Sequence, residues 1–175
     1  MASAETLRKQ IATLGLAMTD FDAVTVQSAL IDFMATDATI NLCYPFGEMF
    51  GPQALYDTAY APLLAALPDL ERRGWIVSAG TDEDGRDWIG CAGHYVGTFV
   101  SPFLEIPPTG HLAHMRYHEF YRVIDGKVVE MQAIWDLPEL MLQANAWPMS
   151  PSLGREMFIP GPATQDGLNS NRRTI

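Results

Sequence analysis

The stretch RYHEFYRVIDGKVVEMQAIWD, residues 116–136, decides the fold of this chain. Two runs rich in aromatic and β-branched residues flank Asp125-Gly126, a dipeptide typical of tight hairpin turns, so the stretch predicts two antiparallel strands. Neighbouring residues of a strand point to opposite faces of a sheet, so only one of His118 and Glu119 can face the core. The register of the hairpin decides which one it is.

Two loop lengths give two registers for this hairpin. A two-residue loop, Asp125-Gly126, mixes polar and apolar side chains on both faces. A three-residue loop, Ile124 to Gly126, pairs Val123 with Lys127 and separates the two kinds of side chain. We expect the three-residue loop, because a sheet with one buried face selects the register that separates polarity. The face that it directs to the core carries Met115, Tyr117, Glu119, Tyr121, Val129, Met131, Ala133 and Trp135.

Glu119 is the only ionisable carboxyl on that face. Burial disfavours the charged form of a carboxyl, so we expect Glu119 to accept and return protons near neutral pH. Tyr117 and Tyr121 flank it on the same face, where a phenol can hold the carboxyl or polarise a substrate carbonyl. The alternative is that a tyrosine or a buried arginine satisfies the carboxylate and that Glu119 does no chemistry.

The rest of the chain runs from helices to strands. Apolar residues three and four apart predict two amphipathic helices within residues 5–34, followed by a strand at 38–45 and a third helix within 51–70. Residues 72–100 predict a hairpin of long strands, and residues 136–145 a closing helix capped by Asp136. Helices first and antiparallel strands afterwards indicate an α+β fold, with the helices packed on one face of a curved sheet.

Length and composition exclude several classes of protein. A chain of 175 residues suits one domain, which we place at residues 1–148, and the Pro- and Gly-rich residues 149–175 predict an extended tail or linker. The formal net charge of −10 argues against a nucleic-acid or anionic-membrane partner. Cys43 and Cys91 lack metal-ligand spacing, and we expect neither a signal peptide nor a membrane span, which favours a cytoplasmic location.

Two longer motifs resemble a known family. GHYVGTFVSPFLEIPPTGH, residues 93–111, is similar to the Gly-x-x-x-Gly strand and PPTG loop of the SnoaL-like polyketide cyclases, within the nuclear transport factor 2 and ketosteroid isomerase superfamily. FYRVIDGKVVEMQAIWDLPEL, residues 120–140, is similar to their DGK hairpin, which runs into a WD and a closing helix. The resemblance covers about residues 5–146. It implies a cone of helices over a strongly curved, mostly antiparallel sheet, with a deep hydrophobic pocket.

The chain also departs from the family that it resembles. Its cyclases typically use an Asp on the last strand and a His on the preceding strand, and these positions fall here on Ala133 and Glu119. The usual EHWD string reads EMQA at residues 130–133. Two hypotheses follow. One is cofactor-free acid/base chemistry, a cyclisation or isomerisation of a small hydrophobic carbonyl compound, with Glu119 as proton-transfer residue. The other is a non-catalytic hydrophobic-ligand-binding or assembly domain that has kept the pocket.

The candidate site residues follow from these hypotheses. The candidate catalytic residues are Glu119, Tyr117 and His94. The candidate ligand contacts are aromatic residues and methionines: Tyr44, Trp75, Tyr95, Phe103, Met115, Tyr121, Met131 and Trp135. We expect no cofactor and no metal, since His111 and His114 would point to opposite faces of a strand.

Two partners are expected. One is a small hydrophobic molecule in the pocket. The other, implied by the resemblance, is a second copy of the chain, with the outer face around Arg116, His118 and Gln132 as the candidate contact of a homodimer.

Overall fold

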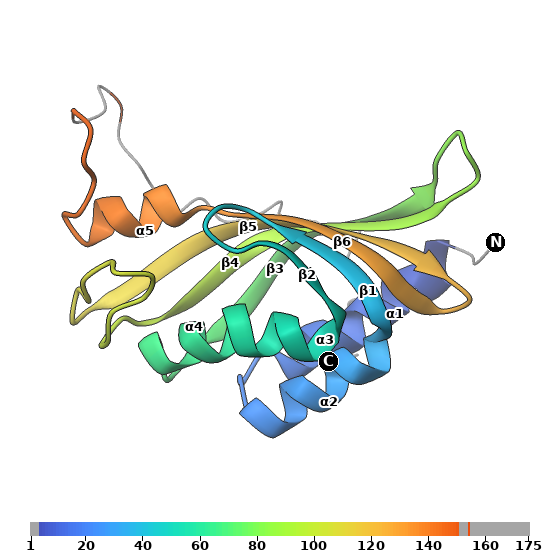
Figure 1. Ribbon diagram of the computed structural model, residues 1–175, viewed down its shortest axis with the longest axis horizontal. Coiled ribbons are helices and arrows are strands. Elements are labelled where there is room, and N and C mark those ends of the chain that lie inside the picture. Colours follow the sequence, from blue (N-terminus) through green and yellow to red (C-terminus); the bar gives the residue numbers. More distant parts are fainter. Residues whose placement is uncertain (1–3, 151–153, 155–175) are drawn as a thin grey trace, which may run out of the picture.

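The structure is a computed structural model that describes residues 4–150 and residue 154 (Figure 1). Its helices are α1 (Ala4–Ala17), α2 (Ala23–Phe33), α3 (Gly51–Leu55), the π-helix η1 (Tyr56–Tyr60), α4 (Ala61–Ala66) and α5 (Leu137–Gln143). Its strands are β1 (Met34–Leu42), β2 (Gly47–Phe50), β3 (Glu71–Thr81), β4 (Asp87–Thr98), β5 (Leu112–Ile124) and β6 (Lys127–Trp135). The α+β fold class is confirmed. The tail predicted at residues 149–175 falls almost wholly outside the described residues, and the domain boundary stays a prediction.

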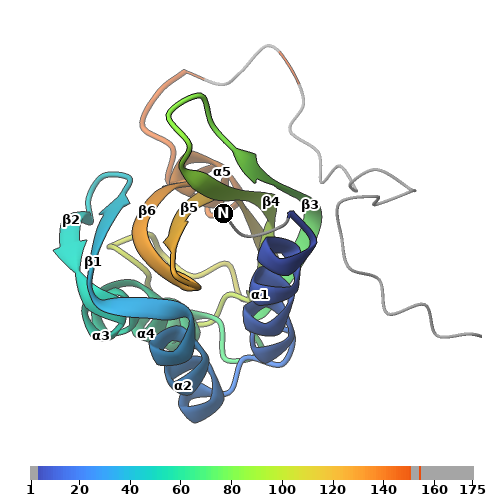
Figure 2. The same cartoon turned by 90° about the vertical axis from the view of Figure 1, so that its right-hand side faces the viewer.

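The strands form one sheet in the order β2-β1-β6-β5-β4-β3. All neighbours are antiparallel except β1 and β6, which run parallel. The sheet curls without closing, and Figure 2 shows α1 beside β3, and α2 and α3 beside β1, so helices cover the concave face. The short helix α5 lies instead at the far end of the sheet. Every helix in the described part of the chain is too short or too polar to span a bilayer.

The helices form where apolar spacing predicts them, with one local change. In α1 the buried residues are Leu7, Ile11 and Leu14, three or four apart. The helix predicted within residues 51–70 is divided, because Pro62 has no amide hydrogen to donate to the carbonyl four residues back. The chain widens there into η1, in which the amide of Ala61 donates to the carbonyl of Tyr56.

The β5–β6 hairpin reaches the predicted face by a different route. Ile124 pairs with Lys127, so the loop is Asp125-Gly126, with φ of 48° and 78°, and the predicted three-residue loop is wrong. The register then shifts, because Val123 pairs with Val128 but Arg122 pairs with Glu130. This bulge adds one residue to β6 and restores the separation of polarity. The residues on the buried face are Tyr117, Glu119, Tyr121, Met131, Ala133 and Trp135 as predicted, with Val128 in place of Val129.

The turn geometry makes a testable prediction. Gly126→Ala should lower the free energy of unfolding by about 1–2 kcal/mol, because a side chain is strained at positive φ. Gly80→Ala is the matched control, since an added Cβ there meets no atom within 4 Å and the backbone does not have positive φ. Urea unfolding of both variants measures the difference. Equal effects at the two positions would contradict the two-residue turn.

Candidate functional site

A cluster of polar side chains occupies the centre of the concave face. It consists of Arg72 on β3, Tyr95 on β4, Glu119 and Tyr121 on β5, and Trp135 on β6. Glu119 is 0% exposed. It lies opposite Cys91 on β4 and Ala133 on β6, so both neighbouring strands present small side chains at the level of the carboxylate. The alternation of the four strands therefore brings one carboxyl and its polar neighbours into the core.

Each oxygen of the Glu119 carboxylate accepts two hydrogen bonds. Oε2 accepts from Nη2 of Arg72 and from the hydroxyl of Tyr121, both at 2.7 Å. Oε1 accepts from the hydroxyl of Tyr95 at 2.8 Å and from the indole nitrogen of Trp135 at 3.1 Å. Hydrogen bonds to ionised groups are about twice as strong as neutral ones. In the structure, tyrosine hydroxyls and a buried arginine therefore satisfy the Glu119 carboxylate.

A second phenol stands behind Tyr95. The hydroxyl oxygens of Tyr60 and Tyr95 are 3.1 Å apart, and because Tyr95 gives its proton to Glu119, Tyr60 is the donor of this bond. Burial, followed by the negative charge of Glu119, raises the pKa of Tyr60, Tyr95 and Tyr121 well above the ordinary value. The three phenols thus remain proton donors around one carboxylate.

Arg72, which the sequence reasoning did not single out, supplies the positive charge of the cluster. Its ion pair with Glu119 is almost fully buried, and the same Nη2 lies 3.4 Å from Sγ of Cys91. Burial raises the pKa of the Cys91 thiol to about 11, so the thiol stays neutral. A signal for Arg72 was present in the sequence: Arg72 and Arg73 are adjacent in a strand, so one of them must point to the same side as the core.

Tyr117 supports the cluster through its ring and not its hydroxyl. Cζ of Arg72 lies 4.2 Å from the centre of the Tyr117 ring, a cation–π contact. The hydroxyl of Tyr117 has no hydrogen-bond partner in the described part of the chain. It points at Gly93, where an added Cβ would lie 2.6 Å from the phenol oxygen, so the absence of a side chain at Gly93 makes the room for Tyr117.

The other predicted ligand contacts divide between the core and elsewhere. Met115, Met131 and Phe103 are buried, and Phe46 packs between Phe103 and Trp135 with ring centroids 6.3 and 5.6 Å apart. Tyr44 is 90% exposed in the turn after β1 and is therefore outside the buried cluster, so its contact with a ligand stays a prediction. The direction of its side chain could not be predicted, because alternation ends with the strand.

Trp75 and His94, two of the predicted site residues, lie together outside the Glu119 cluster. A register shift between Gly74 and Ile76 marks a bulge in β3 at Trp75. The Trp75 indole donates to Nδ1 of His94 at 2.7 Å. His94 lies next to Tyr95 in the sequence and therefore points to the opposite, outer face of the sheet.

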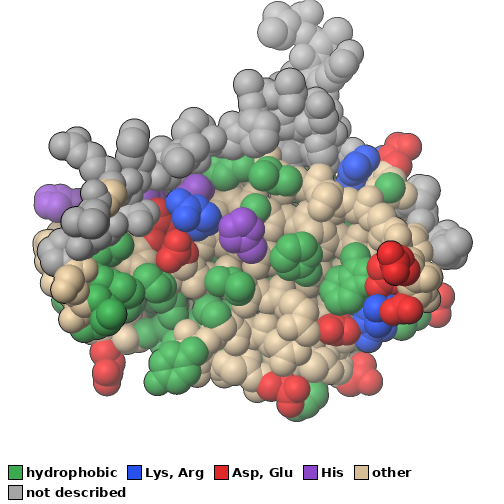
Figure 3. Space-filling view, turned by 90° about the horizontal axis from the view of Figure 1, so that it is seen from above, with side chains coloured by type: hydrophobic (Ala, Val, Ile, Leu, Met, Phe, Trp, Pro, Cys, Tyr) green, Lys and Arg blue, Asp and Glu red, His purple; other side chains and the backbone are tan. Residues whose placement is uncertain are grey.

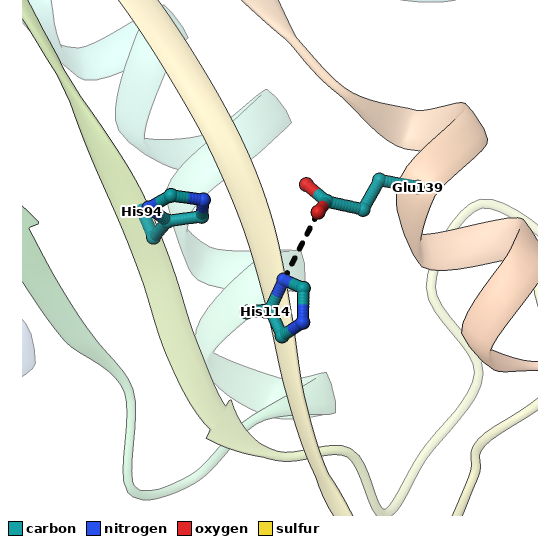
Figure 4. A group of neighbouring side chains, drawn as sticks. All are labelled: His94, His114 and Glu139. Carbon is teal, nitrogen blue, oxygen red and sulfur yellow. Dashed lines mark ion pairs between the residues drawn. The ribbon is translucent and has the colours of Figure 1, made fainter. Parts of the chain in front are cut away.

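A second buried polar cluster lies on the outer face beneath α5 and comprises His94, His114 and Glu139 (Figure 4). Its candidate ligand atoms all lie within 4.8 Å of one another, and two histidines with one carboxylate are a set that suits several metals. The protons do not fit a cation, because Nδ1 of His94 accepts from Trp75 and the neutral ring therefore carries its proton on Nε2. A guanidinium nitrogen of Arg116 also lies 3.6 Å from Glu139. The residues match a hydrogen-bonded cluster better than a metal centre.

Side chains of α5 continue the hydrogen-bond ladder of β5 where β6 ends. The amide of Asp136 donates to the carbonyl of Arg116 at 2.8 Å, and the amide of Arg116 donates to Oε2 of Glu139 at 3.0 Å. The side-chain amide of Gln143 then brackets His114, accepting from its amide at 3.0 Å and donating to its carbonyl at 2.6 Å. The helix thus replaces a strand along this part of β5.

Three cavities of the described residues open on the surface, and Glu119 lines none of them. The first, which we call the α1–α2 groove, has a volume of about 610 Å³ and lies between α1, α2 and the β5–β6 turn at Gly126. The second, of about 350 Å³, lies on the outer face of the sheet, and the third, of about 470 Å³, lies beside the β5–β6 turn. Fully buried side chains surround Glu119, and the deep hydrophobic pocket stays a prediction.

The outer face of the sheet exposes apolar side chains. Phe120 and Ile134 are 50% and 64% exposed, and Figure 3 shows such side chains scattered over this face among polar ones. Arg116 is tied to Asp136 and Glu139 beneath α5, whereas His118 and Gln132 are exposed. The homodimer stays a prediction, as does the cytoplasmic location.

A family model described as SnoaL-like polyketide cyclase matches residues 17–144. The chain belongs to this family. No curated protein matches it. The matched residues include the helices from α2 to α5, the curled sheet and the hairpin that carries Glu119.

Several solved structures share the fold. IdmH from Streptomyces antibioticus, whose name marks it as a candidate polyketide cyclase, is 24% identical over 78% of this chain and 96% of its own, with a TM-score of 0.63. AclR from Streptomyces galilaeus, named as a candidate hydroxylase, is 20% identical over 85% and 91%, with a TM-score of 0.65. TsrD from Streptomyces laurentii is 16% identical over 83% and 99%, with a TM-score of 0.67. At these identities the likeness shows the fold of this SnoaL-like chain and not its chemistry.

The buried ion pair makes a stability prediction. Arg72→Leu should lower the free energy of unfolding by about 3–5 kcal/mol, because it leaves the Glu119 carboxylate buried without its cation. The double variant Arg72→Leu/Glu119→Leu should recover most of the loss. Denaturant unfolding of the single and double variants forms the test, and an equally unstable double variant would contradict the assignment of the loss to an unpaired charge.

The cluster beneath α5 predicts that acid weakens the fold. Burial lowers the pKa of His94 below its ordinary 6.5. Burial alone would raise the pKa of Glu139. Hydrogen bonds from His114 and from the Arg116 amide outweigh burial and hold this pKa below its ordinary 4.5. The unfolded chain therefore takes up these protons first, so stability falls below about pH 6.5 through His94 and falls again below about pH 4.5 through Glu139.

The pH effect is measured by urea unfolding at pH 7.5 and 5.5. His94→Asn should reduce the loss of stability between these two values. His118→Asn, at an exposed position on the same face, is the matched control and should keep the loss. A wild-type stability that does not change over this interval would contradict the role of His94.

Proposed function

We propose that this SnoaL-like protein binds a small, largely apolar carbonyl compound of the polyketide type in its cone and catalyses cofactor-free proton transfer on it. The reaction is a cyclisation or an isomerisation, with Glu119 as general acid/base. The observation that supports the proposal is a fully buried carboxylate surrounded by phenol donors. Replacing a buried ion pair by apolar residues is often neutral or stabilising, so stability alone gives little reason for this pair.

The arrangement supplies both groups that enolate formation needs. In the proposed step Tyr121 or Tyr95 turns its hydroxyl from the carboxylate to the substrate carbonyl oxygen. This exchange keeps the phenol as a donor and opens one lone pair of Glu119. The carboxylate then removes a proton from the carbon next to the carbonyl, while the phenol stabilises the negative charge on oxygen.

The proton then has two possible destinations. In an isomerisation Glu119 returns it to another carbon of the enolate. In a ring closure the enolate carbon attacks a second carbonyl, a carbon–carbon bond forms, and Glu119 delivers its proton to the new alkoxide oxygen. Arg72 keeps the carboxylate oriented in both cases, and Tyr60 supports Tyr95.

A second candidate function is non-catalytic binding of an apolar ligand. It is favoured by the four hydrogen bonds that fill both oxygens of Glu119, and by Ala133 at the position of the usual Asp. Under this alternative the polar cluster is an internal support. The two functions differ in what a change at Glu119 does.

The test is hydrogen–deuterium exchange at the carbon between the carbonyls of neutral aromatic 1,3-diketones, followed by NMR. The wild type should accelerate exchange, and Glu119→Gln should reduce the acceleration by about 10²–10⁴-fold, because an amide cannot take the proton. Glu130→Gln, a carboxyl paired with Arg122 in the outer part of the hairpin, is the matched control and should keep the full rate.

Two further measurements separate lost chemistry from lost structure. Circular dichroism verifies that Glu119→Gln is folded. If it is not, Tyr95→Phe keeps the carboxylate and removes one phenol, and it should lower the rate without abolishing binding of the diketone. Binding without exchange by the wild type would reject the catalytic proposal and favour the second candidate.

A further inference from the structure

The α1–α2 groove has the size and shape of a ligand site. Its volume of about 610 Å³ lies within the ~300–1,000 Å³ of small-molecule pockets. The groove is open because the facing positions of the two helices include small residues, Ala17 on α1 and Ala29 on α2. Buried Leu14 and Phe33 also line it and give it an apolar floor.

The polar rim of the groove offers mainly hydrogen-bond acceptors. The hydroxyl of Thr13 gives its proton to the carbonyl of Lys9, and the hydroxyl of Thr25 gives its proton to Asp22. Both hydroxyls therefore present lone pairs to other groups. Asp32 adds a carboxylate to the rim.

Gln10 closes one end of the groove. Its side-chain Nε2 donates to the carbonyl of Gly126 at 2.7 Å, and its Oε1 is buried, so the acceptors of the rim are those of Thr13, Thr25 and Asp32. The net charge of the chain is −10, which disfavours an anion. The complementary ligand is therefore an apolar body that carries hydroxyl donors and no negative charge.

The floor of the groove is connected to the cluster on the concave face. The rings of Phe33 and Tyr121 meet edge to face with centroids 5.3 Å apart, and Tyr121 donates to Glu119. A molecule in the groove would touch Phe33 and lie one ring away from the phenols. No residue of the Glu119 cluster lines the groove itself.

We infer that the α1–α2 groove is a binding site for a neutral, hydroxylated aromatic compound, separate from the Glu119 cluster and joined to it through Phe33. The site needs no catalysis by Glu119, so it stands whether the chain is an enzyme or a binding protein. Hydroxylated aromatic rings are also what ring closure of a polyketide yields, which makes the groove suited to a product or a product-like effector.

The experiment uses the full chain and 2-naphthol, a neutral aromatic compound with one hydroxyl donor. Binding is followed by amide chemical shifts in two-dimensional NMR, with shifts expected in α1 and α2. Two probes of the same body separate the chemistry: 2-methoxynaphthalene lacks the donor, and 2-naphthoate is an anion. Both probes should bind at least about tenfold more weakly than 2-naphthol. 2-Methoxynaphthalene loses a hydrogen bond, and 2-naphthoate carries a negative charge that the acidic chain disfavours.

Two variants locate the site. Ser28→Trp places a large ring in the groove from an exposed position, so it should fold and should weaken 2-naphthol binding by at least about tenfold. Gln132→Trp places the same ring at the outer-face cavity and should leave the affinity unchanged. The inference is overturned if 2-naphthol does not bind, if Ser28→Trp leaves binding intact, or if Gln132→Trp removes it.

Discussion

The ion pair between Arg72 and Glu119 is the interaction around which the polar interior of this fold is arranged. It joins β3 to β5 across β4, and the donors from Tyr95 and Trp135 bring in β4 and β6, so one carboxylate ties four neighbouring strands together. A buried charge is tolerated only with good partners, and this requirement explains its surroundings: small neighbours at Cys91 and Ala133, and a phenol ring beneath the guanidinium.

The face of Glu119 could be predicted from sequence, although the loop that produces it could not. Polar and apolar side chains separate onto two faces only if the hairpin holds an odd number of residues beyond those of a regular two-residue turn, either in the loop or in a strand. The order of polar and apolar residues in the sequence shows this requirement. The chain meets it with a bulge in β6 and a two-residue turn, not with a three-residue loop. Both solutions have the same parity, so the inner face was right while the turn, and with it Val129, was wrong. Bulges leave little trace in composition, and the bulge in β3 at Trp75 could not be predicted for the same reason.

The partners of Glu119 were harder to predict than its position. Arg72 is forty-seven residues away in sequence and lies two strands away, so only the completed sheet brings it to the carboxylate. The resemblance to the family did not help, because the position that it implies for the acid is occupied by Ala133. The SnoaL-like family match covers the curled sheet and most of its helices, and within this frame the chain holds a carboxylate that takes its donors from four strands. Hydroxylase and cyclase candidates among proteins of the same shape illustrate how far chemistry can vary within it.

The way α5 replaces a strand has a consequence for the solubility of the chain. β6 ends before it covers the backbone groups of His114 and Arg116 on β5. Uncovered groups of this kind form an open strand edge, to which a second polypeptide can add. Glu139 and Gln143 occupy those groups with side chains, which cannot extend the sheet further. The seven residues of α5 therefore serve as a cap against intermolecular strand pairing, and loss of Glu139 and Gln143 would leave these backbone groups open to a second chain.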